Sequence, residues 1–254
     1  MNKLPQITIF FWIMKICATT LGETGGDLLS MTLNVGYAVS SIILVGMFLA
    51  TLISQLVSRK FHPLLYWSVI LMTSMAGTTM SDYMDRTLGL GYAKGSMILV
   101  SILLTIFALW RLSGKSLSVT NISTPSEELL YWTAILFSNT LGTALGDFLA
   151  DQSGLGYCGG ALLIISLLAL VAFAAFYSGI SRVFLFWIAF VLTRPLGATV
   201  GDFFTKPLDV GGIGFGTVGT SIVLFSVLGT LVAYTTWKTR WTNAVVEEDY
   251  RMLR

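Results

Sequence analysis

Four aspartates recur at matched positions within segments that are otherwise strongly apolar. Each follows a tryptophan by fifteen residues and a glycine by five, and they are Asp27, Asp82, Asp147 and Asp202. An ionised side chain is costly in apolar surroundings, so a repeated carboxylate there indicates a function or an ion pair. Four carboxylates at one depth would form an acidic ring, which is typical of cation pathways. Carboxylate oxygens suit hard cations such as Mg²⁺, Mn²⁺ or Ca²⁺, so we predict these aspartates as metal ligands.

Polar residues continue from each aspartate at intervals of four. The four series read Lys15, Thr19, Glu23, Asp27; Ser74, Thr78, Asp82, Arg86; Asn139, Thr143, Asp147, Asp151; and Arg194, Ala198, Asp202, Lys206. Steps of four keep to one slanting face of a helix, and polar faces avoid lipid, so we expect the four stripes to face one another. The predicted substrate or ion pathway comprises Glu23, Asp27, Asp82, Asn139, Asp147, Asp151, Arg194 and Asp202.

Opposite charges on these stripes also predict ion pairs, which would be a purely structural use of the same residues. Arg194 and Glu23 both lie deep in their segments, and we predict that they pair between copies. Such a pair is either a fixed structural contact or a gate or proton-coupled site. We expect Lys15 to find a partner in another copy for the same reason. Two further pairs have the favourable acid-first spacing of four residues: Asp82 with Arg86, and Asp202 with Lys206.

The composition places the chain among membrane proteins. Of its 254 residues, 55% are hydrophobic and only 11% are charged, against about 25% charged in soluble domains. A net charge of +2 gives no reason to expect a nucleic-acid partner. The two cysteines lack the spacing of a zinc site or disulfide framework. No enzyme motif is present, so we expect neither an enzyme nor a cofactor, apart from a transported divalent cation.

Each of the four copies contains two apolar runs, one that ends near the aspartate and one that follows it. Each run approaches the roughly 20 residues that span a bilayer. This predicts an all-α integral membrane protein with eight transmembrane helices. Because every copy spans twice, the four two-helix repeats are parallel and pseudo-symmetric about the membrane normal. The predicted divisions are repeat 1 at 1–60, repeat 2 at 61–115, a polar linker at 116–128, repeat 3 at 129–181, repeat 4 at 182–238 and a cytoplasmic tail at 239–254.

The distribution of basic residues predicts the orientation. In the connections inside copies there are three, Arg86, Lys94 and Lys206, whereas ten lie at the termini or between copies: Lys3, Arg59, Lys60, Arg111, Lys115, Arg182, Lys238, Arg240, Arg251 and Arg254. The positive-inside rule then places both termini in the cytoplasm. We expect the N-terminal apolar run to be retained and not cleaved as a leader, because it aligns with three later copies.

Small residues four apart precede each aspartate, as in Gly142 and Gly146. Such pairs favour close helix packing in lipid. The alternative is that they loosen the helix and free carbonyls as ligands.

The fourfold W-x9-G-x4-D pattern resembles a family of bacterial membrane proteins that is defined by four tandem copies of a repeat of unknown function. Trp12, Trp67, Trp132 and Trp187 carry the matching tryptophan, and the resemblance extends from residue 6 to about 238. It implies a multi-pass protein of the bacterial inner membrane and supplies no function.

Three functions remain open. The leading hypothesis is a secondary transporter or exporter of a divalent metal cation through the acidic centre. A second is a transporter of a small organic or anionic solute that uses Arg194 and Lys15. A third is a non-transporting membrane scaffold or sensor. The expected partners are the lipid bilayer and the transported ion or solute, and the oligomeric state is not predicted.

Overall fold

The computed structural model describes residues 5–58, 61–119, 122 and 124–252, with side chains described as far as residue 238. This part of the chain contains no strand and eight long α-helices: α1 Ile9–Asp27, α2 Tyr37–Val57, α3 Pro63–Asp82, α4 Tyr92–Leu112, α5 Pro125–Asp147, α6 Gly156–Tyr177, α7 Arg182–Thr205 and α8 Thr217–Met252. Four basic residues used for the orientation, Lys3, Arg59, Lys60 and Arg254, lie outside the described residues.

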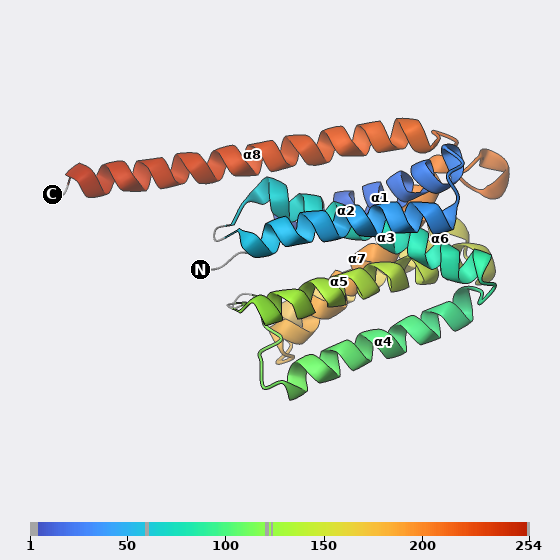
Figure 1. Ribbon diagram of the computed structural model, residues 1–254, viewed down its shortest axis with the longest axis horizontal. Coiled ribbons are helices and arrows are strands. Elements are labelled where there is room, and N and C mark those ends of the chain that lie inside the picture. Colours follow the sequence, from blue (N-terminus) through green and yellow to red (C-terminus); the bar gives the residue numbers. More distant parts are fainter. Residues whose placement is uncertain (1–4, 59–60, 120–121, 123, 253–254) are drawn as a thin grey trace.

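The first helices of the four copies form a closed inner ring. Helix α1 packs against α3 and α7, and α5 packs against the same two helices from the opposite side. Each second helix lies outside the ring on the first helix of the next copy: α2 on α3, α4 on α5, α6 on α7 and α8 on α1. The predicted arrangement of four inner and four outer helices is therefore confirmed. Figure 1 shows that the helices lie side by side, with the α1–α2 and α3–α4 connections at the end opposite the termini.

The inner ring is held by four equivalent glycine contacts. A Cβ atom on Gly197 would lie 2.7 Å from the backbone carbon of Thr19, and one on Gly77 would lie 2.9 Å from that of Asn139. Gly22 meets Ser74 and Gly142 meets Arg194 still more closely. Each glycine thus meets the residue that lies seven positions after the repeat tryptophan of a neighbouring inner helix, which is Thr19, Ser74, Asn139 or Arg194. This confirms the prediction of close packing, since α1, α3 and α5 remain regular up to their aspartates.

The backbone widens directly after three of the four aspartates. Short π-helical turns follow α1, α3 and α5 at Leu28–Thr32 (η1), Tyr83–Thr87 (η2) and Phe148–Gln152 (η4). The chain then reverses through the repeated glycine, which has a positive φ in all four copies: Gly36, Gly91, Gly156 and Gly214. The fourth copy instead forms a 3-10 turn, Leu208–Val210 (η5). In this copy Gly216 also has a positive φ, and α8 starts at Thr217, two residues after Phe215.

Within the described residues, five helices are long and apolar enough to cross a membrane: α2, α4, α6, α7 and the part of α8 from Thr217 to Lys238. Helices α1, α3 and α5 are not among them, whereas α7 is, although it carries a polar stripe as they do. The outer helices expose mainly apolar side chains, including Ile42, Leu104, Phe173 and Phe225. Many polar residues are therefore buried beside an apolar core, while the outer face is mainly apolar, which is compatible with a lipid environment.

Two boundaries differ from the predicted divisions. Helix α5 begins at Pro125, inside the segment 116–128 that we predicted as linker. The reason is a capping box, in which Thr124 accepts from the Glu127 backbone and the Glu127 carboxylate accepts from the Thr124 backbone. Helix α8 continues through most of the predicted tail and ends at Met252.

Candidate functional site

The four repeat aspartates lie together where the inner helices end, and all are at most 5% exposed. Arg86, in the turn that follows α3, contacts two of these aspartates. Its Nε lies 2.9 Å from Oδ1 of Asp82, in its own repeat. Its Nη2 lies 3.3 Å from Oδ2 of Asp147, in the next repeat. One guanidinium therefore bridges two carboxylates of neighbouring copies.

Lys206 makes the equivalent bridge on the opposite side of the ring. Its Nζ lies 3.2 Å from Oδ1 of Asp202 and 3.4 Å from Oδ2 of Asp27. The predicted pairs within copies two and four are confirmed. The bridges between copies were not predicted, because the positions four residues after Asp27 and Asp147 hold Met31 and Asp151, which are not cations.

The two bridging cations lie just beyond the inner helices and are held in their charged forms. Burial alone would lower the pKa of the Lys206 ammonium, but Asp202 and Asp27 raise it above the ordinary value of 10.5. Burial alone would also lower the pKa of the Arg86 guanidinium, but Asp82 and Asp147 raise it above its ordinary value. The two side chains are 21% and 32% exposed, so they separate the buried aspartates from the surface.

A third ion pair lies deeper on the axis of the ring. Nη2 of Arg194 is 2.9 Å from Oε2 of Glu23, and both side chains are buried. This confirms the predicted pairing between copies four and one. The same carboxylate oxygen accepts from the hydroxyl groups of Thr78, at 3.3 Å, and Thr143, at 3.4 Å. These threonines were not predicted as site residues, although they occupy the stripe position that Glu23 occupies in copy one.

Three carboxylates from three different helices converge closely enough to hold one metal ion. One oxygen each from Glu23, Asp147 and Asp202 lies within 4.8 Å of the other two. The predicted metal set contained Asp27 and Asp82 in addition to Asp147 and Asp202, but these two lie outside the group. Glu23 takes their place because its longer side chain, one turn deeper on α1, reaches the level of the aspartates.

The other predicted pathway residues lie away from this group. The Asn139 amide donates to Oγ1 of Thr73 at 2.7 Å, so it joins α5 to α3. Asp151 is exposed at the mouth of the ring and accepts a hydrogen bond from the Tyr92 hydroxyl at 3.3 Å. Lys15 has no hydrogen-bond acceptor among the described residues, and its fully buried Nζ instead lies 4.0 Å from the ring centroid of Phe190, in the fourth copy.

Asp85 is a buried carboxylate that the sequence analysis missed. It lies between the stripe residues Asp82 and Arg86, accepts from the Ser81 hydroxyl at 3.3 Å, and fills the space left by Gly95 on α4. Its position has no acidic counterpart in the other copies, and so the repeat pattern gave no signal for it.

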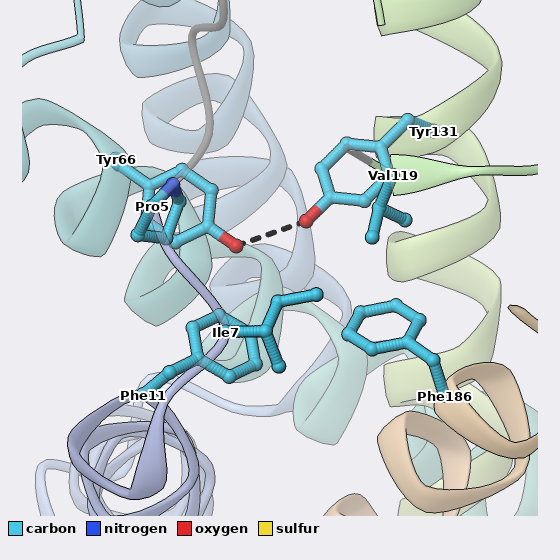
Figure 2. Close-up of a pocket in the computed structure, with 7 residues that line it drawn as sticks. All are labelled: Pro5, Ile7, Phe11, Tyr66, Val119, Tyr131 and Phe186. Atoms are coloured by element: carbon cyan, nitrogen blue, oxygen red, sulfur yellow. Dashed lines mark hydrogen bonds between the residues drawn. The ribbon is translucent and has the colours of Figure 1, made fainter. Parts of the chain in front are cut away.

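The opposite end of the ring is closed by aromatic side chains (Figure 2). The residue before each repeat tryptophan lines a small hollow there, and Pro5, Ile7 and Val119 complete the lining: Phe11, Tyr66, Tyr131 and Phe186. The hydroxyl groups of Tyr66 and Tyr131 point toward each other and form a hydrogen bond of 2.9 Å. The axis of the inner ring therefore has an aromatic end and a charged end.

The fourfold pattern of helix, aspartate and reversing glycine agrees with a known sequence family. The family described as Repeat of Unknown Function (DUF347) matches the chain four times, at residues 10–61, 65–116, 130–181 and 185–240. The chain belongs to this family. Each DUF347 repeat contributes one inner helix, one ring aspartate and one outer helix. No curated protein and no solved structure matches the chain.

Proposed function

We propose that this protein is a secondary transporter of a hard divalent cation, with the cation pathway along the axis of the inner ring. The proposal rests on one observation, the excess of buried carboxylates over the cations that contact them. Five carboxylates line the axis and three cations contact them: Glu23, Asp27, Asp82, Asp147 and Asp202 against Arg86, Arg194 and Lys206. The formal excess is two negative charges among these described residues.

A buried excess of negative charge requires compensation, because unpaired carboxylates lose their hydration without gaining a partner. Bound protons or a bound cation provide it. The group of Glu23, Asp147 and Asp202 favours a cation, because three oxygens within 4.8 Å of one another match the ligand arrangement of hard ions. Asp27 and Asp82 extend the acidic surface toward the mouth of the ring.

In this proposal all eight helices cross the bacterial inner membrane. The inner helices α1, α3 and α5 carry buried polar residues and are shielded from lipid by the outer helices. With both termini in the cytoplasm, as the basic residues predict, the acidic ring lies toward the periplasm and the aromatic end toward the cytoplasm. Four parallel repeats then place a single site on the axis, as in other transporters built from internal repeats.

Flux into proteoliposomes tests the proposal. Purified protein is reconstituted and the uptake of Mg²⁺, Mn²⁺ and Ca²⁺ is followed with entrapped indicators. We expect uptake of at least one of these ions, and its loss in Glu23→Gln and Asp147→Asn. Asp209→Asn is the matched control, because it neutralises an exposed carboxylate in the loop after α7. Uptake that persists in the two site variants, or that protein-free vesicles equal, would refute the proposal.

The pairing of the ring aspartates favours a second candidate function, a static membrane scaffold. Each of the four aspartates contacts Arg86 or Lys206, and the deeper Glu23 is paired with Arg194. A scaffold would lose stability in the aspartate variants and would show no flux for any ion in the wild type. The proteoliposome experiment therefore separates the two candidates.

A further inference from the structure

The guanidinium of Arg194 occupies an oxygen cage on the axis of the inner ring. Its Nη2 lies 2.5 Å from the Thr78 hydroxyl, 2.7 Å from the Thr143 hydroxyl, 2.9 Å from the Glu23 carboxylate and 3.4 Å from the Ser74 carbonyl. These four oxygens come from α1, α3 and α5, while the side chain itself comes from α7. One nitrogen position is therefore surrounded by all of the inner helices.

The cage is built around a single cationic atom and not around the planar fork of an arginine. An Nη2 group carries two hydrogens, yet four oxygens lie within 3.4 Å of it. The neighbouring Nη1 makes one contact, of 3.4 Å, with the Thr19 carbonyl. Nε is buried and has no hydrogen-bond partner. A bidentate arginine site would use two or three nitrogens in parallel, so this site matches a small cation better than it matches a guanidinium fork.

We propose that this cage is a binding site for a small monovalent cation, of the class of ammonium, guanidinium or K⁺, and that Arg194 is its built-in occupant. The other copies carry Thr19, Ser74 and Asn139 at the equivalent position, so the occupant is supplied once per molecule. With the guanidinium in place, the axis is closed between the aromatic end and the acidic ring. The role as an axial plug rests on the proposed function, whereas the occupancy of the cage does not.

Truncation of Arg194 vacates the cage without disturbing its oxygens. The stem of the side chain runs beside Gly142, where a Cβ atom would overlap with Arg194 Cβ and Cγ. Arg194→Ala leaves an internal space that begins at Gly142 and ends at the Glu23 carboxylate. Because that carboxylate is then buried without its cation, the variant is expected to be destabilised and to gain stability from any cation that fits.

Chemical rescue of thermal stability tests the occupancy of the cage. Melting of purified wild type, Arg194→Ala and Arg182→Ala is followed in detergent with millimolar guanidinium, ammonium or K⁺ chloride, and with choline chloride at equal ionic strength. We expect at least one small cation to raise the Tm of Arg194→Ala by about 3 °C or more above choline. The wild type and Arg182→Ala, which removes an exposed guanidinium at the start of α7, should not respond. An equal response of all three proteins would overturn the inference.

If Arg194→Ala cannot be isolated in any of these salts, Arg194→Lys and Arg194→Met decide the question. The lysine ammonium reaches toward the Nη2 position, and methionine fills the stem without charge. We expect Arg194→Lys to retain most of the wild-type Tm and Arg194→Met to lose it. Equal melting of these two variants would overturn the inference, because the cage would then not require a cation.

Leakage from vesicles tests the plug separately. Proteoliposomes with Arg194→Ala should leak K⁺ faster than wild type by about tenfold or more, and guanidinium should slow the leak. If small cations rescue the Tm of Arg194→Ala but the variant does not leak K⁺, the cage is a binding site and the role of Arg194 as a plug is refuted. Absence of divalent uptake by the wild type would refute the proposed function and leave the thermal rescue unaffected, so the two failures are distinguishable.

Discussion

The ammonium of Lys206 lies 3.4 Å from the carboxylate of Asp27, although 179 residues separate them in the chain. This contact closes the ring between the last repeat and the first. Arg86 makes the equivalent contact between the second repeat and the third. The other two junctions have no such cation, because Met31 and Asp151 stand there. The ring thus has two alternating kinds of junction, in agreement with the 120-residue spacing between its halves.

Removal of the Lys206 charge should destabilise the ring at its first-to-last junction. We expect Lys206→Met to lower the free energy of unfolding by between about 1 kcal/mol, typical of an exposed pair, and about 3 kcal/mol, typical of a buried one. Lys94→Met, at an exposed position near the same end, is the control and should change it little. Unfolding in a denaturant series measures both. Equal effects of the two substitutions would contradict the bridge.

The pH dependence of that effect follows from the sign of the pKa shift. The folded state raises the pKa of Lys206, so its stabilisation is complete below the ordinary value of 10.5 and is lost only as pH rises through the folded value. We therefore expect the difference between wild type and Lys206→Met to stay constant between about pH 6 and pH 9. Melting curves across this range provide the measurement. A difference that disappears within the range would mean that Lys206 is not held as a cation.

The glycine contacts of the inner ring predict that a methyl group added at these positions destabilises the protein. Gly197→Ala places a Cβ atom 2.7 Å from the Thr19 backbone, which can move only if α1 and α7 separate. We expect a loss of about 1–3 kcal/mol, as for overpacking in a core. Gly229→Ala, in the outer helix α8 where a Cβ meets nothing within 4 Å, should instead be neutral or stabilising. The melting temperatures of the two variants provide the measurement. Equal changes in Tm for Gly197→Ala and Gly229→Ala would contradict the prediction.

The tyrosine pair at the aromatic end predicts strong non-additivity. Tyr66→Phe or Tyr131→Phe alone leaves one buried hydroxyl without its partner, which should cost about 1–3 kcal/mol. The double variant should recover most of this loss, because all four aromatic residues around the hollow are then phenylalanine and no hydroxyl group is left without a partner. A double-mutant cycle of unfolding free energies measures the coupling. Additive losses would show that the hydroxyl groups do not depend on each other.

The repeat pattern was sufficient to predict the helices and the inner ring. The tryptophan, glycine and aspartate spacings located each inner helix and its end, and the uncharged second helices indicated which four would lie outside. The Arg194–Glu23 pair was predicted because both residues are deep and of opposite charge. These inferences depend on helical periodicity and on the cost of burying charge, which the sequence carries directly.

Contacts between copies were harder to predict. Sequence spacing pairs residues on one helix, so it assigned Arg86 to Asp82 and gave no indication that Asp147 shares it. The group of Glu23, Asp147 and Asp202 depends on how far each side chain reaches across the axis, which the repeat register does not specify. Lys15 was expected to pair and lies over Phe190 instead. Such arrangements follow from the relative rotation and depth of the four inner helices.

The binding of Mn²⁺ to purified protein tests the central claim most directly. Isothermal titration in detergent should give one site in the wild type and in Asp209→Asn, with affinity reduced by at least about tenfold in Glu23→Gln and Asp147→Asn. Asp147→Asn that binds as tightly as the wild type, or a wild type that binds none of Mn²⁺, Mg²⁺ and Ca²⁺, would contradict a cation site on the axis.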